Sequence, residues 1–287
     1  MTAQAKFTVA VHTSDQESLA DWFEQHRHWA VLTGAGCSTA SGIPDYRDRD
    51  GAWKRCPPVQ IRDFLASRAV RQRYWARSMT GWPAFAVARP NAAHRALAGL
   101  EAAGRIERLV TQNVDGLHQQ AGSRRVTDLH GRLDRVECLG CGNEIPRAEF
   151  QQRLRAENRD WPLHLAPMAP DGDADLDGAS FDEFRVPACE RCGGVLKPGV
   201  VFFGDAIPAE RSREALAAVR AAEALLVVGS SLMVWSGYRL VRAAVEAGRV
   251  VGAINLGRTR ADGLLSFKVE SPCADALAAL VDCVGVH

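Results

Sequence analysis

Short apolar runs alternate with amphipathic segments at both ends of the chain, and this alternation predicts the fold. Four runs are apolar enough to form buried strands, namely 29–33, 106–111, 224–229 and 250–255. Segments with helical spacing lie between them, from Asn91 as N-cap to Gly104, from 208 to about 222, and from 236 to Gly248. Strands that alternate with helices indicate an α/β protein with a doubly wound, parallel, Rossmann-like sheet.

Three further helices are predicted from spacing and capping residues. Residues 14–17 form a capping-box pattern for a helix from about 15 to 26. A helix over 62–79 is expected to end at Gly81-Trp82-Pro83, because glycine and proline both disfavour a helix interior. Near the C-terminus, Ser271 as N-cap and Pro272 at the first helical position predict a last helix.

The middle of the chain contains two close cysteine pairs. Cys138 and Cys141 form one pair, and Cys189 and Cys192 form the other. Four thiolates are the ligand set of a tetrahedral structural zinc site, which leaves no open position for a substrate. Two disulfides or unrelated buried thiols are the alternatives. For Cys37, which has no such partner, a small packed residue is favoured over a nucleophile.

The cysteine pairs interrupt the alternation and therefore indicate a second, inserted module. The aspartate-rich stretch at 168–178 between the pairs is expected to form an exposed loop. We expect a Rossmann-like domain over 1–47, 84–133 and 203–287, a helical insertion over 48–83, and a zinc-binding module over 134–202. The fold class is thus a doubly wound sheet with a small zinc-binding and helical module.

Composition excludes several classes of protein. The 287 residues are 47% hydrophobic, which suits one large globular domain carrying a smaller one. A net charge of +1 gives no global attraction to nucleic acid or to an anionic membrane. Neither an apolar run long enough for a membrane span nor a signal or transit pattern is present, so we expect a cytoplasmic protein.

The first predicted strand runs into a glycine-rich turn within residues 30–47. Gly34 and Gly36 allow the backbone to turn tightly and to approach a phosphate, and Ser38 adds a hydroxyl donor. Thr39 stands where a dinucleotide fingerprint has its third glycine, and no acidic residue ends an obvious second strand about 20 residues further on. Taken alone, the stretch is as consistent with a serine-rich surface turn.

Polar residues also follow three other predicted strands. Gln112, Asn113 and Asp115 follow one, Gly229-Ser230-Ser231 ends the next, and Asn255 ends the last. Capping alone explains each serine, but together with the glycine turn these strand ends predict a dinucleotide site at one edge of the sheet.

Two histidines are candidates for a general base near this edge. His130 precedes a glycine, and His118 follows the Asn-Val-Asp segment closely. An imidazole titrates near neutral pH and is therefore a natural base. Taken alone, each histidine fits an ordinary helix or loop residue better than a base.

The motifs together resemble the sirtuin family of NAD-dependent protein deacylases. Those that carry the likeness, over about 30–276, are GAGCSTASGIPDYR, TQNVDGLH, His130-Gly131, the paired CxxC, VVFFGD and GSSLMV. More narrowly, RCPPVQIRDFL, YWARSMTGWP and APDGD resemble the class II branch, which includes the fourth, mitochondrial, sirtuin of animals. Without a transit peptide, the chain is identified as a bacterial member.

The resemblance implies roles for individual residues. His130 would be the base, with Asn113 as a second catalytic residue. The cofactor site would comprise Gly34, Ala35, Gly36, Ser38, Asp45, Tyr46, Arg47, Gln112, Asn113, Val114, Asp115, Gly229, Ser230, Ser231, Asn255, Leu256 and Cys273. The backbones of Val201, Phe202, Phe203 and Gly204 and of Leu232, Met233 and Val234 would hold an acyl-lysine peptide as an added strand.

The implied activity is transfer of an acyl group from lysine to ADP-ribose with release of nicotinamide, with NAD and zinc as cofactors. Acylated proteins or peptides are the implied partners of a monomer. Asp205 and Trp235 depart from the glutamate and proline common in relatives, which leaves the peptide preference open. Protein mono-ADP-ribosylation, a zinc-containing NAD dehydrogenase and a non-catalytic NAD sensor are the alternatives.

Tyr74 and Arg77 raise the question of which acyl group is removed. Their i, i+3 spacing places a hydroxyl and a guanidinium on one helix face, where they can hold a carboxylate. Sirtuins that remove malonyl and succinyl groups have a tyrosine and an arginine at this spacing, so the resemblance implies a preference for acidic acyl groups. A solvated face of an arginine-rich helix is the alternative.

Overall fold

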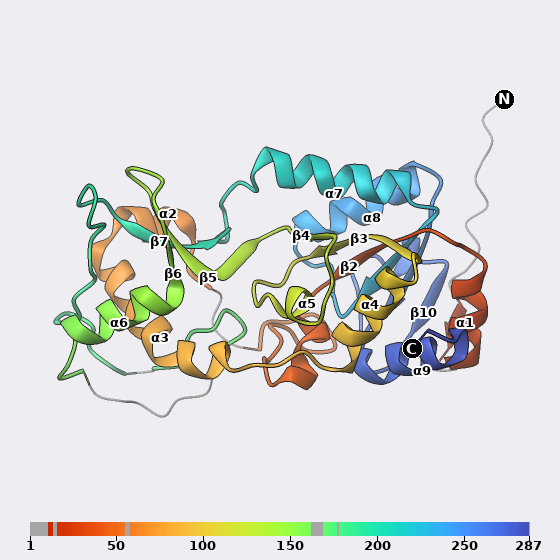
Figure 1. Cartoon of the computed structure of the whole chain (residues 1–287), viewed down its shortest axis with the longest axis horizontal. Coiled ribbons are helices and arrows are strands. Elements are labelled where there is room, and N and C mark those ends of the chain that lie inside the picture. The colour runs from red at the N-terminus through yellow and green to blue at the C-terminus, as the bar shows by residue number, and fades with distance from the viewer. Residues whose placement is uncertain (1–10, 14–15, 55–57, 162–168, 177, 287) are drawn as a thin grey trace.

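The computed structural model describes residues 11–13, 16–54, 58–161, 169–176 and 178–286, and it has a larger and a smaller part (Figure 1). The larger part is built on a seven-stranded sheet in which every described strand pair is parallel. In spatial order its strands are β1 (Val11–Thr13), β10 (Phe267–Val269), β9 (Val250–Ile254), β8 (Ala224–Val228), β2 (Trp29–Thr33), β3 (Ile106–Thr111) and β4 (Val126–Asp128). The predicted fold class is confirmed.

Helices cover both faces of this sheet (Figure 1). On one face lie α1 (Gln16–Glu24), α4 (Ala92–Ala102) and α9 (Cys273–Val284), and on the other lie α7 (Ala209–Ala221) and α8 (Trp235–Glu246). Alternate residues of β2 enter the two cores: Trp29 packs with the first set, and Ala30 and Leu32 with the second. Among the described residues, no helix has the length and apolar character needed to cross a membrane.

The capping residues were predicted with mixed success. Asn91 caps α4 as expected, and its side chain accepts hydrogen bonds from the backbone N–H groups of Ala93 (2.8 Å) and His94 (3.4 Å). The prediction for the last helix is wrong by one residue, because Pro272 has extended backbone angles and is itself the N-cap of α9. The capping box proposed for the first helix includes residues 14 and 15, which lie outside the described residues.

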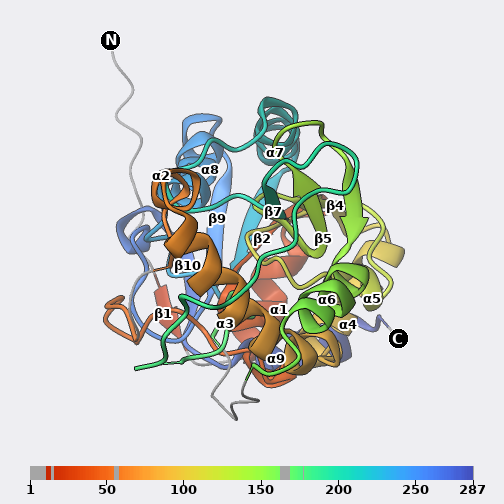
Figure 2. The same cartoon turned by 90° about the vertical axis from the view of Figure 1, so that its left-hand side faces the viewer.

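The smaller part combines the predicted helical insertion with the cysteine-containing module. A three-stranded sheet has the order β6 (Glu144–Pro146), β5 (Gly131–Cys138), β7 (Leu196–Val200). Three helices pack on it: α2 (Ile61–Ala66), α3 (Arg68–Ala86) and α6 (Arg147–Glu157). They share one core, in which the Trp75 and Phe150 rings lie 4.7 Å apart. Figure 2 shows the three helices with this sheet on the side of the molecule that faces the viewer. The two insertions therefore form one structural unit.

The predicted helix break at Gly81-Trp82-Pro83 is wrong, because α3 continues through Pro83 to Ala86. Proline lacks the N–H that would reach the carbonyl of Met79, four residues earlier. In this structure Gln151 Nε2 donates to that carbonyl at 2.7 Å, so the oxygen keeps a partner. The break falls instead at Ser67, the N-cap of α3. The predicted domain boundary between 83 and 84 thus lies inside a helix.

The aspartate-rich segment is not the exposed loop that its composition predicts. Residues 169–176 pack against α3, where Ala174 N donates to Arg77 O at 2.9 Å and Arg77 Nε donates to Ala174 O at 2.9 Å. A Cβ at Gly81 would lie 2.3 Å from Gly172 O, so this glycine lets the segment approach the helix. Asp173 is only 3% exposed as a result.

The hydrogen bond that replaces the missing proline donor predicts a stability effect. Gln151→Ala should lower the free energy of unfolding by about 1 to 3 kcal/mol, because Met79 O and the buried Arg147 Nη1 both lose their partner. Urea unfolding would measure this, with Gln152→Ala on the exposed side of the same helix as the control. Equal midpoints for the two variants would contradict the assignment.

Candidate active site and metal centre

A cavity of about 610 Å³ lies where the carboxyl ends of β2, β3, β8 and β9 meet the smaller part. This is the edge at which parallel sheets of this kind bind ligands, because strand order reverses at β2. Most of the candidate site residues predicted from the sequence lie in the wall of this cavity. They are Gly34, Ala35, Gly36, Ser38, Asp45, Tyr46, Arg47, Tyr74, Gln112, Asn113, Val114, Asp115, His130, Val201, Phe202, Phe203, Gly204, Gly229, Ser230, Ser231, Leu232, Met233, Val234, Asn255 and Leu256. Cys273 and Arg77 are not among the lining residues.

The glycine-rich turn packs backbone to backbone against the end of β8. Gly34 N donates to Val228 O at 3.0 Å, and Gly36 N donates to Gly229 O at 2.9 Å. A Cβ on Gly34 would lie 2.7 Å from Ser230 Cβ, so a side chain there would push the two segments apart. The chain then forms two short 3₁₀ turns, Ala35–Cys37 and Thr39–Ser41.

Cys37 belongs to the protein core and not to the cavity wall. The residue is 1% exposed, and burial raises the pKa of its thiol well above the ordinary value. A protonated, buried thiol is a poor nucleophile. The structure therefore supports the packed role.

A polar network joins the glycine turn to the segment after β3. Asn113 Nδ2 donates to Gly34 O at 3.0 Å and to Ser38 Oγ at 3.1 Å, and Ser38 Oγ donates to Asp115 Oδ2 at 2.7 Å. Burial raises the pKa of Asp115, while hydrogen bonds from Leu117 N and Ser38 oppose that rise. Amide, hydroxyl and carboxyl groups are thus held at fixed positions on one wall of the cavity.

His130 is the candidate base that faces the cavity. Its Nδ1 lies 3.0 Å from Gln112 O, and since a carbonyl only accepts, Nδ1 carries the proton. Nε2 therefore has a free lone pair, which accepts the Ser236 hydroxyl at 2.8 Å. Burial, with a smaller effect of Arg239, lowers the pKa of His130 to about 4. The imidazole is therefore neutral at pH 7.

His118, the competing candidate, is a core residue. It is 1% exposed, and its Nε2 lies 2.9 Å from Thr33 Oγ1. Thr33 Oγ1 donates to Thr111 Oγ1, so it accepts the proton of His118 Nε2. This histidine does not line the cavity.

Sequence reasoning missed several lining residues. Ser236, Arg239, Trp53, Pro170 and Asp171 all line the cavity. In the sequence, Ser236 marks only the start of a helix. Its position beside His130 follows from the fold, which places α8 next to this histidine. Pro170 and Asp171 reach the cavity because the buried 169–176 segment crosses α3.

The predicted carboxylate clamp of Tyr74 and Arg77 stays a prediction. Tyr74 lines the cavity, but Arg77 does not. Arg77 Nε donates a hydrogen bond to Ala174 O, and the guanidinium interacts electrostatically with the nearby buried Asp173. Burial raises the pKa of Tyr74 well above its ordinary value, and Asp173 and Asp171 add to that rise. Burial also raises the pKa of Asp173 itself.

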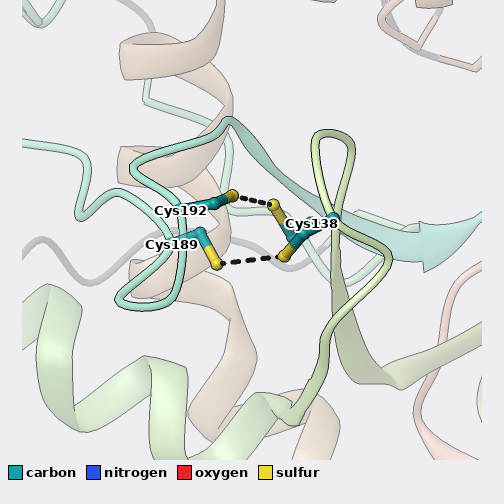
Figure 3. Close-up of side chains that lie close together, drawn as sticks. Cys138, Cys189 and Cys192 are labelled. Atoms are coloured by element: carbon teal, nitrogen blue, oxygen red, sulfur yellow. Dashed lines mark hydrogen bonds between the residues drawn. The ribbon is translucent and has the colours of Figure 1, made fainter.

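The four paired cysteines come together at the tips of two loops (Figure 3). Cys138 Sγ lies 3.5 Å from Cys192 Sγ, Cys141 Sγ lies 3.8 Å from Cys189 Sγ, and none of the four is in a disulfide. Tetrahedral zinc with bonds of about 2.3 Å places its sulfur ligands about 3.8 Å apart. The cysteines therefore fit the predicted structural zinc ion, and the alternative of two disulfides is not supported.

A second group of Cys37, His94 and His118 is also close enough to hold a metal. However, His94 Nδ1 accepts the Asn91 backbone N–H at 3.3 Å, which places the proton on Nε2. Ligation through Nε2 would need an imidazolate, so this cluster fits side-chain packing better than a metal ion.

Comparison with known proteins identifies relatives that cover most of the chain. A family model described as the Sir2 family matches residues 34–236. A protein of Xanthomonas campestris pv. campestris, named NAD-dependent protein deacetylase, is 59% identical over 273 residues and covers 95% of this chain and 93% of its own. A protein of Bordetella bronchiseptica with the same name is 56% identical, with coverages of 93% and 98%.

Solved structures share the fold. A structure described as Sir2 with a p53 peptide and NAD+ has a TM-score of 0.77 at 28% identity, covering 95% of this chain and 100% of its own. Another, described as Sir2 bound to acetylated peptide, has a TM-score of 0.75 at 27% identity, with coverages of 95% and 100%.

The cysteine geometry predicts one zinc ion per chain, which Cys141→Ser should lose. Structural zinc contributes an apparent binding free energy of about 10 to 16 kcal/mol in small peptides, comparable to the stability of a domain. The smaller part should therefore melt in this variant, as measured by metal analysis and thermal unfolding. Cys283→Ser, an exposed thiol on α9, is the control. Unchanged zinc content in Cys141→Ser would contradict the site.

Proposed function

The chain belongs to the Sir2 family, and from this premise we propose that it is an NAD-dependent protein-lysine deacylase. It transfers the acyl group from a lysine side chain to ADP-ribose and releases nicotinamide. The names of the bacterial relatives support this activity. The observation that carries the proposal is His130, a neutral imidazole with its Nε2 lone pair at the wall of the cavity.

The residues around the cavity fit a dinucleotide. The N–H groups of Gly34 and Gly36 already have carbonyl partners, so we propose that the Ala35 N–H group and the Ser231 hydroxyl serve phosphate and ribose. Asn255 and Leu256 lie at the end of β9 for the adenosine. Gln112, Asn113 and Asp115 would hold the nicotinamide ribose and carboxamide. When bound, NAD supplies an ADP-ribosyl group, whose bond to nicotinamide breaks as the acyl oxygen attacks.

His130 is the base of the reaction. Its Nδ1–H is fixed on Gln112 O, so the tautomer with a free Nε2 is the one present. Nε2 would accept the proton of a substrate hydroxyl in place of the Ser236 hydroxyl that it accepts here. The reaction requires no protein nucleophile, and Cys37, the one considered from the sequence, is buried and protonated.

The peptide would lie between two segments on opposite sides of the cavity. Residues 201–204 come from the smaller part, and residues 232–234 follow β8. An extended peptide adds to such edges through its backbone, so we propose an acylated peptide or protein as the partner. The name of the bacterial relatives, NAD-dependent protein deacetylase, supports acetyl as the acyl group.

The compartment and assembly state that we propose are the cytoplasm and a monomer. The four zinc-binding thiols need a reducing compartment, which the cytoplasm provides.

The alternatives are less well supported. A dehydrogenase of this kind needs a catalytic metal with an open coordination position. The four paired cysteines would fill all four positions of a zinc ion. In the cluster of Cys37, His94 and His118, His94 carries its proton on Nε2, which does not suit metal binding through that nitrogen. A sensor would not need a base beside the cavity. Protein ADP-ribosylation would use the same residues, and nothing in the described site favours it over deacylation.

The activity is tested with an acetyl-lysine peptide and NAD. Mass spectrometry should find deacetylated peptide, nicotinamide and acetylated ADP-ribose in equal amounts. ADP-ribose attached to the protein, without loss of the acetyl group, would support the alternative transferase and overturn the deacylase.

His130→Ala should lower kcat/KM for deacylation by about 10² to 10⁴, the usual effect of losing a general base. ADP-ribose affinity should stay within about threefold, because the remaining cavity groups are unchanged. His28→Ala, an exposed histidine paired with Glu107, is the control for loss of an imidazole. Full activity of His130→Ala would exclude the assignment.

The low pKa of His130, about 4, predicts an unusual pH profile. The neutral form is the active one, so activity is lost only as the pH falls through the pKa of the free enzyme. kcat/KM should therefore stay flat from about pH 8 to about pH 6, where an unperturbed histidine of pKa about 6.5 would already show a decline. An acid limb centred near 6.5 would contradict the burial argument.

A further inference from the structure

We propose that Ser236 is a positioning residue for His130. Its hydroxyl donates to Nε2 of the neutral imidazole before the proton transfer, and its oxygen accepts a hydrogen bond from Nε2 after it. The inference rests on the proposed function, because it takes His130 as the base. In that function Ser236, which lines the cavity beside this histidine, only gives way to the substrate hydroxyl.

Helix capping, the usual role of a serine at a helix start, does not account for Ser236. The helix α8 begins at Trp235, its N-cap is Val234, and no side chain caps it. The bond to His130 Nε2 at 2.8 Å is the one hydrogen bond that the described residues give to the Ser236 hydroxyl. The hydroxyl is therefore directed at the base.

The His130 ring is held at both nitrogens, by two different elements. Nδ1 lies 3.0 Å from Gln112 O, directly after β3, and Nε2 lies 2.8 Å from Ser236 Oγ, in the first turn of α8. The His130 backbone is fixed as well, because its carbonyl accepts Val201 N at 2.8 Å. Without the Ser236 hydroxyl, the ring would keep only the bond at Nδ1 and would be less well oriented for proton transfer.

The two segments that hold the ring pack directly on each other. A Cβ on Gly237 would lie 2.7 Å from Gln112 Nε2, so this glycine lets the first turn of α8 approach the Gln112 side chain. Ser230 Oγ fixes the same side chain by donating to Gln112 Oε1 at 2.7 Å. The position of Ser236 relative to the Gln112 carbonyl is therefore set by this packing.

The protonated form of His130 is the state that most needs a partner. Burial and the positive charge of Arg239, which also lines the cavity, lower the pKa of this histidine. Arg239 lies three residues after Ser236 on α8, and its Nη2 donates to Ser212 Oγ at 2.7 Å. A hydrogen bond from a charged N–H is roughly twice as strong as a neutral one. The Ser236 oxygen therefore stabilises the imidazolium more than the Ser236 hydroxyl stabilises the neutral ring.

One hydroxyl can serve both states of the ring. A serine hydroxyl has one proton and two lone pairs, and it rotates about its Cβ–Oγ bond. The substrate hydroxyl first takes the place of Ser236 at Nε2. Its O–H bond then breaks, the proton forms a bond to Nε2, and the electron pair stays on the substrate oxygen. As this oxygen bonds to the acyl carbon, Ser236 Oγ accepts the Nε2–H.

Two isosteric substitutions test the proposal, because threonine and valine differ in the hydroxyl. With an acetyl-lysine peptide, Ser236→Thr should keep kcat within about threefold, whereas Ser236→Val should lower kcat by about five- to thirtyfold. KM for NAD should stay within about twofold in both variants, because the cofactor contacts are unchanged. Ser266→Ala, which removes a hydroxyl that donates to Val251 O at 3.0 Å away from the cavity wall, is the control. Equal kcat values for the threonine and valine variants would overturn the proposal.

Magnetic resonance of ¹⁵N-labelled histidine gives a readout that does not depend on activity. The His130 Nε2 resonance should differ between Ser236→Thr and Ser236→Val, whereas the Nδ1 resonance, which reports the bond to Gln112 O, should not. An Nε2 resonance that is the same in both variants would overturn the proposal. Binding of ADP-ribose by each variant shows that it is folded.

Ser236→Ala removes the hydroxyl without added bulk, and it should lower kcat by the same factor as Ser236→Val. Full activity of Ser236→Ala would overturn the proposal even if the larger side chains disturbed the fold. A wild-type protein that does not deacetylate the peptide would overturn the proposed function. An active wild type with unaffected Ser236 variants would overturn this inference alone, so the two failures are distinguishable.

Discussion

The whole site depends on one close backbone contact, between the Gly34–Gly36 turn and Gly229 at the ends of β2 and β8. A Cβ on Gly229 would lie 2.3 Å from Cys37 N, and this glycine has φ +61°. The two strands are neighbours in the sheet, so their carboxyl ends are already adjacent. The absence of side chains lets both turns meet directly, and their backbone groups then form one wall of the cavity.

This contact also orders the polar groups of a third strand end. Asn113 reaches Gly34 O, and Ser38 holds Asp115, so the segment after β3 is tied to the same turn. Ser230 donates to Gln112 Oε1 at 2.7 Å, which joins the end of β8 to it as well. The backbone carbonyl of Gln112 in turn fixes the proton of His130. The tautomer of the base is thus a consequence of how the strand ends are joined.

The opposite wall depends on buried charge. Arg147 is fully buried, with its guanidinium 4.8 Å from the Trp82 ring and a hydrogen bond to Ser78 O at 3.2 Å. Asp173 is buried nearby, and its environment raises its pKa well above the ordinary value, mainly by desolvation. Such groups are costly to bury alone, so α3, α6 and the 169–176 segment must stay together. Their packing brings Tyr74 and Asp171 to the cavity.

The sequence analysis predicted well what depends on local pattern. The strand from Ile106 to Thr111, the Asn91 cap and the four zinc-binding cysteines follow from periodicity, capping chemistry and ligand spacing. It failed where a distant residue changed the local preference: Gln151 supplies the donor that lets a helix contain Pro83, and α3 buries an aspartate-rich segment. The class II resemblance and the role of each site residue remain predictions.

The choice between the two histidines shows the same limit. Their sequence contexts are similar, but His118 points into the core toward Thr33, while His130 lies at the cavity with Ser236. Burial lowers the pKa of His130, which makes it a weak base in the free protein. The imidazole is therefore neutral at pH 7, and its Nε2 accepts the Ser236 hydroxyl at the cavity. The fold, through the partners that it gives each ring, distinguishes the two histidines where their sequence contexts do not.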